Sequence, residues 1–201
     1  MSRHEGDPVP HEHQFYRTTL KGLLSLDLAA CGTFTYRRKT GFRHLDDVRI
    51  QEAEAKGLIH DKDNFAYRLS LEERVQRVQA LFEGMARLEG GAKQTIHYTA
   101  VAPAVVVQAV TRGGNNIFNY IFNEKRGVPV VNLDALQEVL DVFADELLSP
   151  IYVGWVRGYQ DDERAKLDTF IAEHPQVKVS HPRRAFSALI HDLGEHSDWM
   201  E

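Results

Sequence analysis

The chain has 201 residues, of which 43% are hydrophobic and 26% are charged. These values are typical of a globular protein with a sizeable core and argue against wholesale disorder. The formal net charge of −5 argues against a uniformly basic nucleic-acid binder, but a local basic groove is compatible with it.

Cysteine content and hydropathy indicate the compartment. The single cysteine excludes an intrachain disulfide framework and fits a reducing environment. The first residues do not form a secretory signal, and no apolar run reaches membrane-spanning length. We therefore expect a cytoplasmic protein with no membrane partner.

The amino-terminal part combines a polar lead-in with an alternating apolar segment. Residues 1–13 contain two prolines and three histidines, and we expect them to be flexible. His11 and His13 are spaced to share a metal, but no third ligand lies nearby, so we expect no metal site. Residues 16–30 follow a two-residue apolar period that predicts a long half-buried strand, with a helix as the alternative. The alternating side chains are Leu20, Leu24, Leu26 and Leu28.

Residues 33–45 mix aromatic and basic side chains. Such a segment can follow a nucleic-acid backbone while an aromatic ring stacks on a base. The alternative is a solvated hairpin whose aromatic rings pack inward. Residues 50–68 are expected to be irregular or weakly helical. The basic residues are Arg37, Arg38, Lys39 and Arg43, and the aromatic ones are Phe34, Tyr36 and Phe42.

An amphipathic helix over residues 71–88 is the clearest predicted element. Ser70 and Glu73 have the spacing of a capping box, and Gly90-Gly91 is expected to end the helix. The two glycines allow backbone amides to approach a ligand, and a cation and several neutral polar groups follow them. This loop is a candidate phosphate cradle, with a plain solvated loop as the alternative. Its polar side chains are Lys93, Gln94, Thr95 and His97.

The rest of the chain alternates strands and helices. We expect strands at 103–110, 117–122, 128–131 and 151–156, and helices at 133–147, from Asp161 to His174, and from Pro182 to Gly194. The order of these elements predicts an α+β fold with a ferredoxin-like character.

Other reactive side chains have ordinary explanations. Cys31 has no activating base nearby and is expected to be a small core residue. The aspartate pairs at 46–47 and 161–162 are typical of turns or helix starts rather than catalytic dyads. The sequence of residues 112–116 favours a plain turn over an anion-binding site. We expect neither enzymatic activity nor a cofactor, because no nucleophile–base pair, metal set or nucleotide motif is present in the sequence.

Five motifs resemble the backbone subunit of type I CRISPR Cascade complexes, most closely the DevR autoregulator branch associated with subtype I-B. The resemblance covers roughly residues 14–172, and Gly90-Gly91-Ala92-Lys93-Gln94 is its most specific motif. The other four are Lys21-Gly-Leu-Leu-Ser-Leu-Asp-Leu, Thr40-Gly-Phe-Arg, Arg74-Val-Gln-Arg-Val-Gln-Ala-Leu and Tyr152-Val-Gly-Trp.

The resemblance implies a modified RNA-recognition-motif fold that assembles along a guide RNA without cleaving it. It divides the chain into the lead-in at 1–13, a partial RNA-recognition-motif domain at 14–160 with two packed helices, and a helical tail at 161–201. Expected partners are guide RNA and other Cascade subunits, including copies of the backbone subunit. The implied RNA-binding residues are Gly90, Gly91, Lys93, Gln94, Thr95 and His97, with Arg37, Arg38, Lys39 and Arg43 as further candidates.

The chain departs from the family pattern at its amino end. The family opens with a first strand and a Ser/Asn/Glu/Gly-rich motif, and neither precedes Tyr16. The chain therefore resembles the carboxy-terminal portion of a full subunit. It also fits a truncated viral or regulatory relative that acts as an anti-CRISPR protein by occupying assembly surfaces. Loss of the first strand is expected to expose a sheet edge for pairing with another chain.

Overall fold

A three-stranded sheet organises the larger part of the chain. In the computed structural model, which describes residues 18–37, 45–90 and 101–201, the strands lie in the order β4-β7-β8. These strands are β4 (Val105–Gln108), β7 (Ile151–Trp155) and β8 (Val177–Ser180). The central strand β7 pairs antiparallel with β4 and parallel with β8. Every residue of β7 is buried, because both faces of the sheet are covered.

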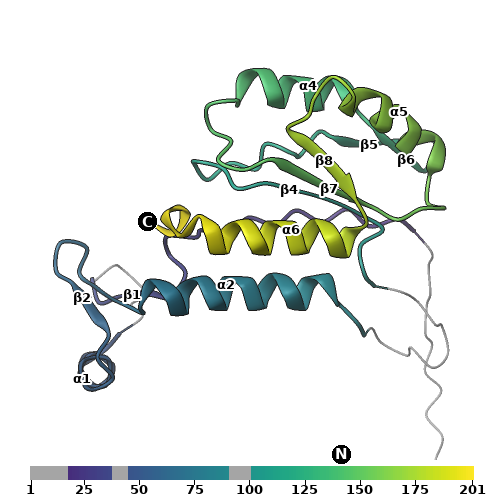
Figure 1. The fold of residues 1–201 in the computed structure, drawn as a ribbon. Helices are drawn as coiled ribbons and strands as arrows, with labels where there is room; N and C mark the ends of the chain where they lie inside the picture. The colour runs from purple at the N-terminus through teal and green to yellow at the C-terminus, as the bar shows by residue number, and fades with distance from the viewer. Residues whose placement is uncertain (1–17, 38–44, 91–100) are drawn as a thin grey trace, which may run out of the picture.

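Helices cover the two faces of this sheet (Figure 1). On one face lie α2 (Leu71–Ala86) and α6 (Pro182–Glu195), and on the other lie α4 (Leu133–Val142) and α5 (Asp161–Ile171). The side chains of β7 alternate between the two layers, as the strand period requires. Tyr152 belongs to the core beside α2 and α6, and Ile151, Val153 and Trp155 belong to the core beside α4 and α5.

The packing of α2 confirms its predicted start. Glu73 N donates to Ser70 Oγ over 3.3 Å, and Ser70 N donates back to the Glu73 carboxylate over 3.2 Å, which completes the capping box. Val75, Val78 and Phe82 bury one stripe of the helix against α6. The helix ends at Ala86, before the glycine pair that was expected to end it.

Gly154 on β7 permits the close approach of α6 to the sheet. A Cβ at this position would lie 2.5 Å from Pro182 Cα and 2.7 Å from Val106 Cγ1. Pro182 occupies the predicted first turn of α6. The glycine is therefore needed for space rather than for its backbone angles.

A hairpin joins the α4 and α5 layer. Its strands are β5 (Phe122–Lys125) and β6 (Val128–Val131), and Arg126 and Gly127 form the turn with positive φ values of 56° and 78°. Buried Glu163 of α5 accepts a hydrogen bond from Val131 N over 3.0 Å and contacts Lys166. The contact with Lys166 lowers the pKa of the Glu163 carboxyl, so the charged group ties α5 to the hairpin.

A second sheet stands apart from this main body at one end of the molecule (Figure 1). We call its described residues, 33–37 and 45–69, the small module. Strands β1 (Thr33–Thr35), β2 (Ile59–Asp61) and β3 (Ala66–Arg68) pair antiparallel in the order β1-β3-β2, beside α1 (Asp47–Ala55). The module has its own core, centred on Leu45, Ala53 and Tyr67.

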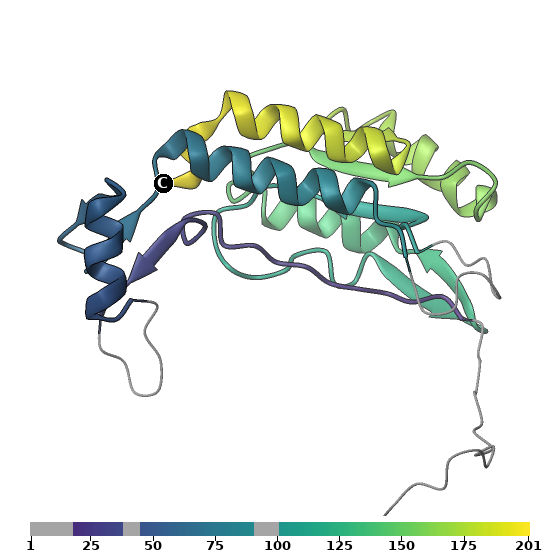
Figure 2. The ribbon, with the colours of Figure 1, turned by 90° about the horizontal axis from the view of Figure 1, so that it is seen from below.

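Residues 18–28, which we call the strap, run extended along the main body (Figure 2). The strand expected over residues 16–30 is wrong for its described part, because residues 18–27 form no ladder with any described strand. The strap ends in a turn in which Cys31 N donates to Leu28 O over 3.2 Å. Alternating leucines thus produced an extended segment without sheet pairing.

Buried Arg74 fastens this turn to the carboxy-terminal end. Its guanidinium donates to the carbonyl oxygens of Cys31 at 2.7 Å, Ala29 at 2.9 Å, Leu28 at 3.3 Å and Met200 at 2.6 Å. Met200 belongs to a final 3-10 turn, η1 (Ser197–Met200), and is fully buried. One side chain of α2 therefore connects segments from both ends of the chain.

The mixed α+β class is confirmed, with several differences in detail. Residues 117–120 form turns rather than a strand, so β5 begins only at Phe122. The expected helices at 133–147 and 161–174 end at Val142 and Ile171. The part expected as a helical tail, 161–201, supplies β8 to the sheet and α6 to its cover. No helix in the described part of the chain is long and apolar enough to cross a membrane.

Candidate nucleic-acid interface

A cluster of rings occupies the small module. The His60 ring stacks on Tyr67 with centroids 4.5 Å apart and planes 6° apart. Tyr36 lies 5.9 Å from each of these rings and 6.0 Å from Phe65, and its hydroxyl lies 3.0 Å from His60 Nε2. Phe34 packs on the module core. Phe34 of β1 and Tyr36 just after it therefore pack inward, as the hairpin alternative expected, and Phe42 lies outside the described residues.

Tyr67 links the cluster to α1. Its hydroxyl donates to Glu54 Oε1 over 2.6 Å. This hydrogen bond, together with burial and the Glu54 charge, raises the pKa of Tyr67 from its ordinary value of 10.0 to about 12. The phenol is neutral at physiological pH and acts as a structural donor.

Phe65 differs from Phe34, Tyr36 and Tyr67 because it is exposed to solvent. It lies at the end of the β2–β3 turn with a φ of 54°, and its side chain is 45% exposed. A left-handed conformation costs a residue with a Cβ about 1–2 kcal/mol, which is why glycine or asparagine is usual at such positions. The sequence thus keeps a large exposed aromatic ring where a small residue would be less strained.

Arg37 is the one predicted basic residue of the 33–45 segment that the structure describes. It is exposed, and its guanidinium carbon lies 5.1 Å from the centroid of the Phe65 ring. A cation–π contact uses the face of the guanidinium and leaves its N–H edges able to donate to phosphate oxygens. Arg38, Lys39 and Arg43 lie outside the described residues.

Gly90 is the one described residue of the predicted phosphate cradle. It is exposed with a φ of 119°, a conformation that L side chains rarely adopt, and a Cβ there would meet nothing within 4 Å. Gly91, Lys93, Gln94, Thr95 and His97 lie outside the described residues. The small module precedes α2 and Gly90 follows it, and the 16-residue helix between them is roughly 24 Å long. The two described members of the predicted sites therefore lie toward opposite ends of α2.

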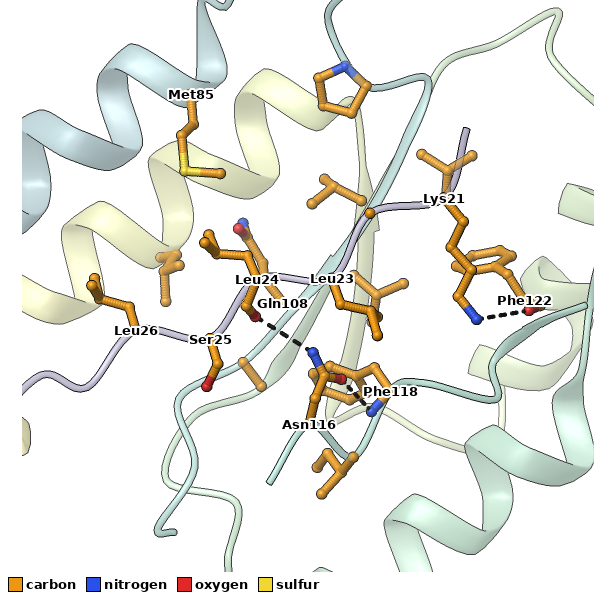
Figure 3. A pocket seen from close by; sticks show the side chains of 18 of the residues that line it. Lys21, Leu23, Leu24, Ser25, Leu26, Met85, Gln108, Asn116, Phe118 and Phe122 are labelled. Carbon is orange, nitrogen blue, oxygen red and sulfur yellow. Dashed lines mark hydrogen bonds between the residues drawn. The ribbon is translucent and has the colours of Figure 1, made fainter. Parts of the chain in front are cut away.

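A groove of about 990 Å³ lies between the strap and β4 (Figure 3). Lys21 Nζ donates to the carbonyl oxygens of Asn119 and Phe122, the latter over 3.2 Å. Asn116 Nδ2 donates to Leu24 O over 3.4 Å. These bonds hold the strap beside the loop that precedes β5.

The lining of the groove is mainly apolar, and Gln108 contributes a buried polar atom to it. Met85 of α2, Val107 of β4 and Phe118 contribute to it. Gln108 Nε2 is buried there and finds no hydrogen-bond partner among the described residues. A groove of this composition suits an apolar chain with few polar contacts better than a phosphate.

The turn at residues 112–116 uses its polar groups within the fold. Arg112 N donates to Glu146 O over 2.7 Å, and Asn116 Oδ1 accepts from Phe118 N over 3.0 Å. These bonds support the plain-turn interpretation rather than an anion site.

The remaining candidates also have structural roles. Cys31 is half-buried, its thiol donates to Asp27 O over 3.2 Å, and burial raises its pKa, which disfavours the nucleophilic thiolate. Asp46 caps α1 by accepting from Arg49 N over 2.9 Å. Asp161 accepts from Gly158 N over 2.9 Å, and Gln160 is the N-cap of α5. Within the described ranges, no three His, Cys, Asp or Glu side chains form a group that could hold a metal ion.

Comparisons with protein-family models, curated proteins and solved structures found no match to this chain. The family resemblance of the sequence is therefore a prediction, and the candidate interface depends on the described geometry. Sequence reasoning missed Phe65 and His60. The turn-forming run Asp61-Lys-Asp-Asn64 was the signal that could have revealed a hairpin with Phe65 at its tip.

Proposed function

We propose that this chain is a non-catalytic CRISPR Cascade backbone subunit, or the carboxy-terminal portion of one. In this role it holds guide RNA and contacts neighbouring subunits in the cytoplasm during antiviral defence. The five sequence motifs suggest the family. The Arg37–Phe65 pair is the observation that best supports RNA binding. An exposed aromatic ring beside a guanidinium suits single-stranded RNA, because the ring stacks on a base and the cation contacts a phosphate.

The proposal includes a partial RNA-recognition-motif fold. In this assignment, α2 and α6 are the two helices packed on one face of the β4-β7-β8 sheet. The helix expected at 133–147 packs as α4 on the opposite face, so α6, from the expected tail, takes its place. The loop after Gly90 follows the guide-RNA backbone in this proposal. The opposite face of the sheet is occupied by α4 and α5. RNA is therefore assigned to the small module and to the loop after α2 rather than to the sheet face.

An RNA-binding titration tests this function. Fluorescence anisotropy with a labelled single-stranded RNA at two salt concentrations should give an affinity that falls as salt rises. Phe65→Gly relieves the backbone strain and removes the ring, so it should keep the fold and weaken binding by about 5- to 150-fold, which corresponds to the 1–3 kcal/mol of one stacked base. Phe65→Tyr should bind like the wild type.

A matched control separates stacking from general exposure of rings. Tyr120 is an aromatic residue that is 71% exposed on the main body, and Tyr120→Ala should leave RNA affinity unchanged. Wild-type protein without any salt-sensitive RNA affinity would exclude RNA binding by this chain. Equal affinity of the wild type and Phe65→Gly would exclude Phe65 as the stacking residue.

A second candidate function is a truncated viral or regulatory relative that inhibits Cascade by occupying its assembly surfaces. The outer edge of β4, which no described strand covers, favours it, because an open strand edge is a template for pairing with another chain. Capture of a Cascade subunit in the absence of RNA, together with loss of interference on co-expression, would support inhibition over RNA holding.

A further inference from the structure

The outer edge of β4 presents unused backbone groups to the groove. Val156 N donates to Ala104 O over 2.9 Å, and the antiparallel register continues this bonded alignment at Val106 and Gln108. The intervening residues, Val105 and Val107, therefore direct their N–H and C=O groups away from β7. In the described part of the chain, β4 is the last strand of its sheet on this side.

The strap already has the side-chain alternation of a neighbouring strand. Leu26 and Leu28 pack on the core beside α2 and α6, as Val106 of β4 does. Figure 3 shows Leu24 and Leu26 pointing toward the helices, whereas Leu23 points toward Phe118. The side chains of the strap therefore already point to the same two faces of the sheet as those of β4. Pairing the two segments requires the strap to shift sideways, but it does not require its side chains to change faces.

Apolar exposure gives the strap a reason to move. Leu20, Leu23 and Leu24 are 78%, 56% and 55% exposed, and the groove beside them is mainly apolar. Moving the strap into the groove would remove leucine surface from water and supply partners for the β4 edge.

Anchors at both ends keep the strap near β4. Arg74 holds the turn at Leu28 and Ala29, and Lys21 bonds to Asn119 and to Phe122 at the start of β5. Between these anchors, the Leu24 carbonyl has one bond of 3.4 Å to Asn116. Among the contacts of the described residues, closing the strap therefore disturbs one long hydrogen bond to the groove wall between its two fixed ends.

We propose that the strap is a closing strand that moves into the groove and pairs with β4 as a fourth strand of the sheet. The described groove is the open state, in which the β4 edge is accessible. The closed state hides that edge, so the strap controls whether another chain can pair with it. The inference depends on the groove and on the strap contacts, and not on RNA binding.

Residue-resolved amide hydrogen exchange of the full chain tests the closure. The groove-facing amides of Val105 and Val107 should exchange at least about tenfold more slowly than unprotected amides, because they are bonded while the strap is closed. The amides of Val106 and Gln108 bond to β7 and should be protected in both states.

Two variants identify the strap as the source of protection. Leu20→Ser combined with Leu24→Ser alters only exposed side chains, so the fold should persist, and exchange at Val105 and Val107 should accelerate. Leu81→Ser changes an exposed leucine of α2 outside the groove and should have no effect on these amides. Unprotected Val105 and Val107 amides in the wild type would overturn the proposal, as would protection that the double variant leaves intact.

Discussion

The main body and the small module bury their side chains in different ways. In the main body, the two cores on either side of the β4-β7-β8 sheet include fully buried residues such as Ile151 and Met200. The small module has three buried residues in its core and carries Phe65 and Arg37 on its surface. The difference teaches that the stability of this chain resides mainly in the body, whereas the strained exposed ring that we propose as an RNA-stacking residue lies on the lightly packed module.

The largest test of this contrast is truncation in the body core. Ile151→Ala removes buried methyl groups from the central strand and should lower the free energy of unfolding by about 2–5 kcal/mol. Both tryptophans, Trp155 and Trp199, lie in the main body, so denaturant unfolding followed by tryptophan fluorescence reports this region. A loss below about 1 kcal/mol would contradict tight packing around β7.

A smaller effect is expected from overpacking at the sheet–helix contact. Gly154→Ala places a Cβ 2.5 Å from the backbone of Pro182, which cannot rotate away as a flexible side chain would. The free energy of unfolding should fall by about 1–3 kcal/mol. Gly84→Ala is the control, because a Cβ on that α2 residue meets nothing within 4 Å and alanine favours a helix. Thermal unfolding of the two variants should therefore shift in opposite directions.

Alkaline pH should weaken the small module through Tyr67. The folded pKa of Tyr67 is raised to about 12 from its ordinary value of 10.0. Its contribution to stability is therefore complete below about pH 10 and is lost as pH rises through about 12. Tyrosinate absorbance should show a late-titrating group that disappears in Tyr67→Phe, whereas Tyr152 of β7, whose pKa is also raised by burial and by its hydrogen bond to Asp192, should titrate late in both proteins. A Tyr67 that titrates at its ordinary pKa would indicate that the bond to Glu54 is not maintained in solution.

The smallest effect is expected at the exposed start of α1. The side chains of Arg49 and Asp46 are 62% and 41% exposed, and their ion pair is open to solvent. Arg49→Ala should change stability by less than about 1 kcal/mol, since exposed pairs contribute little. Asp46→Ala also removes the helix cap and should cost about 0.5–2 kcal/mol. Circular dichroism melts of both variants test this order, which would be reversed if the ion pair dominated.

Local signals predicted much of the main body. Ser70 and Glu73 identified the start of α2 because a capping box acts within one helical turn. Pro182 likewise identified the start of α6. The strand β8 was missed because its four residues carry a weak local pattern and depend on parallel pairing with distant β7. The strap shows the reverse error, since alternation specifies the facing of side chains but does not supply a partner strand.

The candidate site was less predictable than the fold. The sequence shows that Tyr36 is next to basic Arg37, but it could not decide whether the Tyr36 ring packs inward or faces solvent. That outcome depends on His60 and Tyr67, which strand pairing brings to Tyr36 from more than one hairpin away. Phe65 was overlooked because its importance comes from a backbone angle, which residue type alone does not specify.

The hydrogen bonds of buried Arg74 to residues 28–31 and to Met200 have a consequence for biosynthesis. Its bond to the Met200 carbonyl spans 126 residues of sequence. At about 5–20 residues per second, a ribosome needs roughly 6–25 s to make the stretch between them. During that interval, α2 emerges without α6, which covers its apolar stripe, and without the final acceptor of its buried guanidinium. The amino-terminal half of the chain must therefore remain soluble as an incomplete polypeptide until the last helix is synthesised.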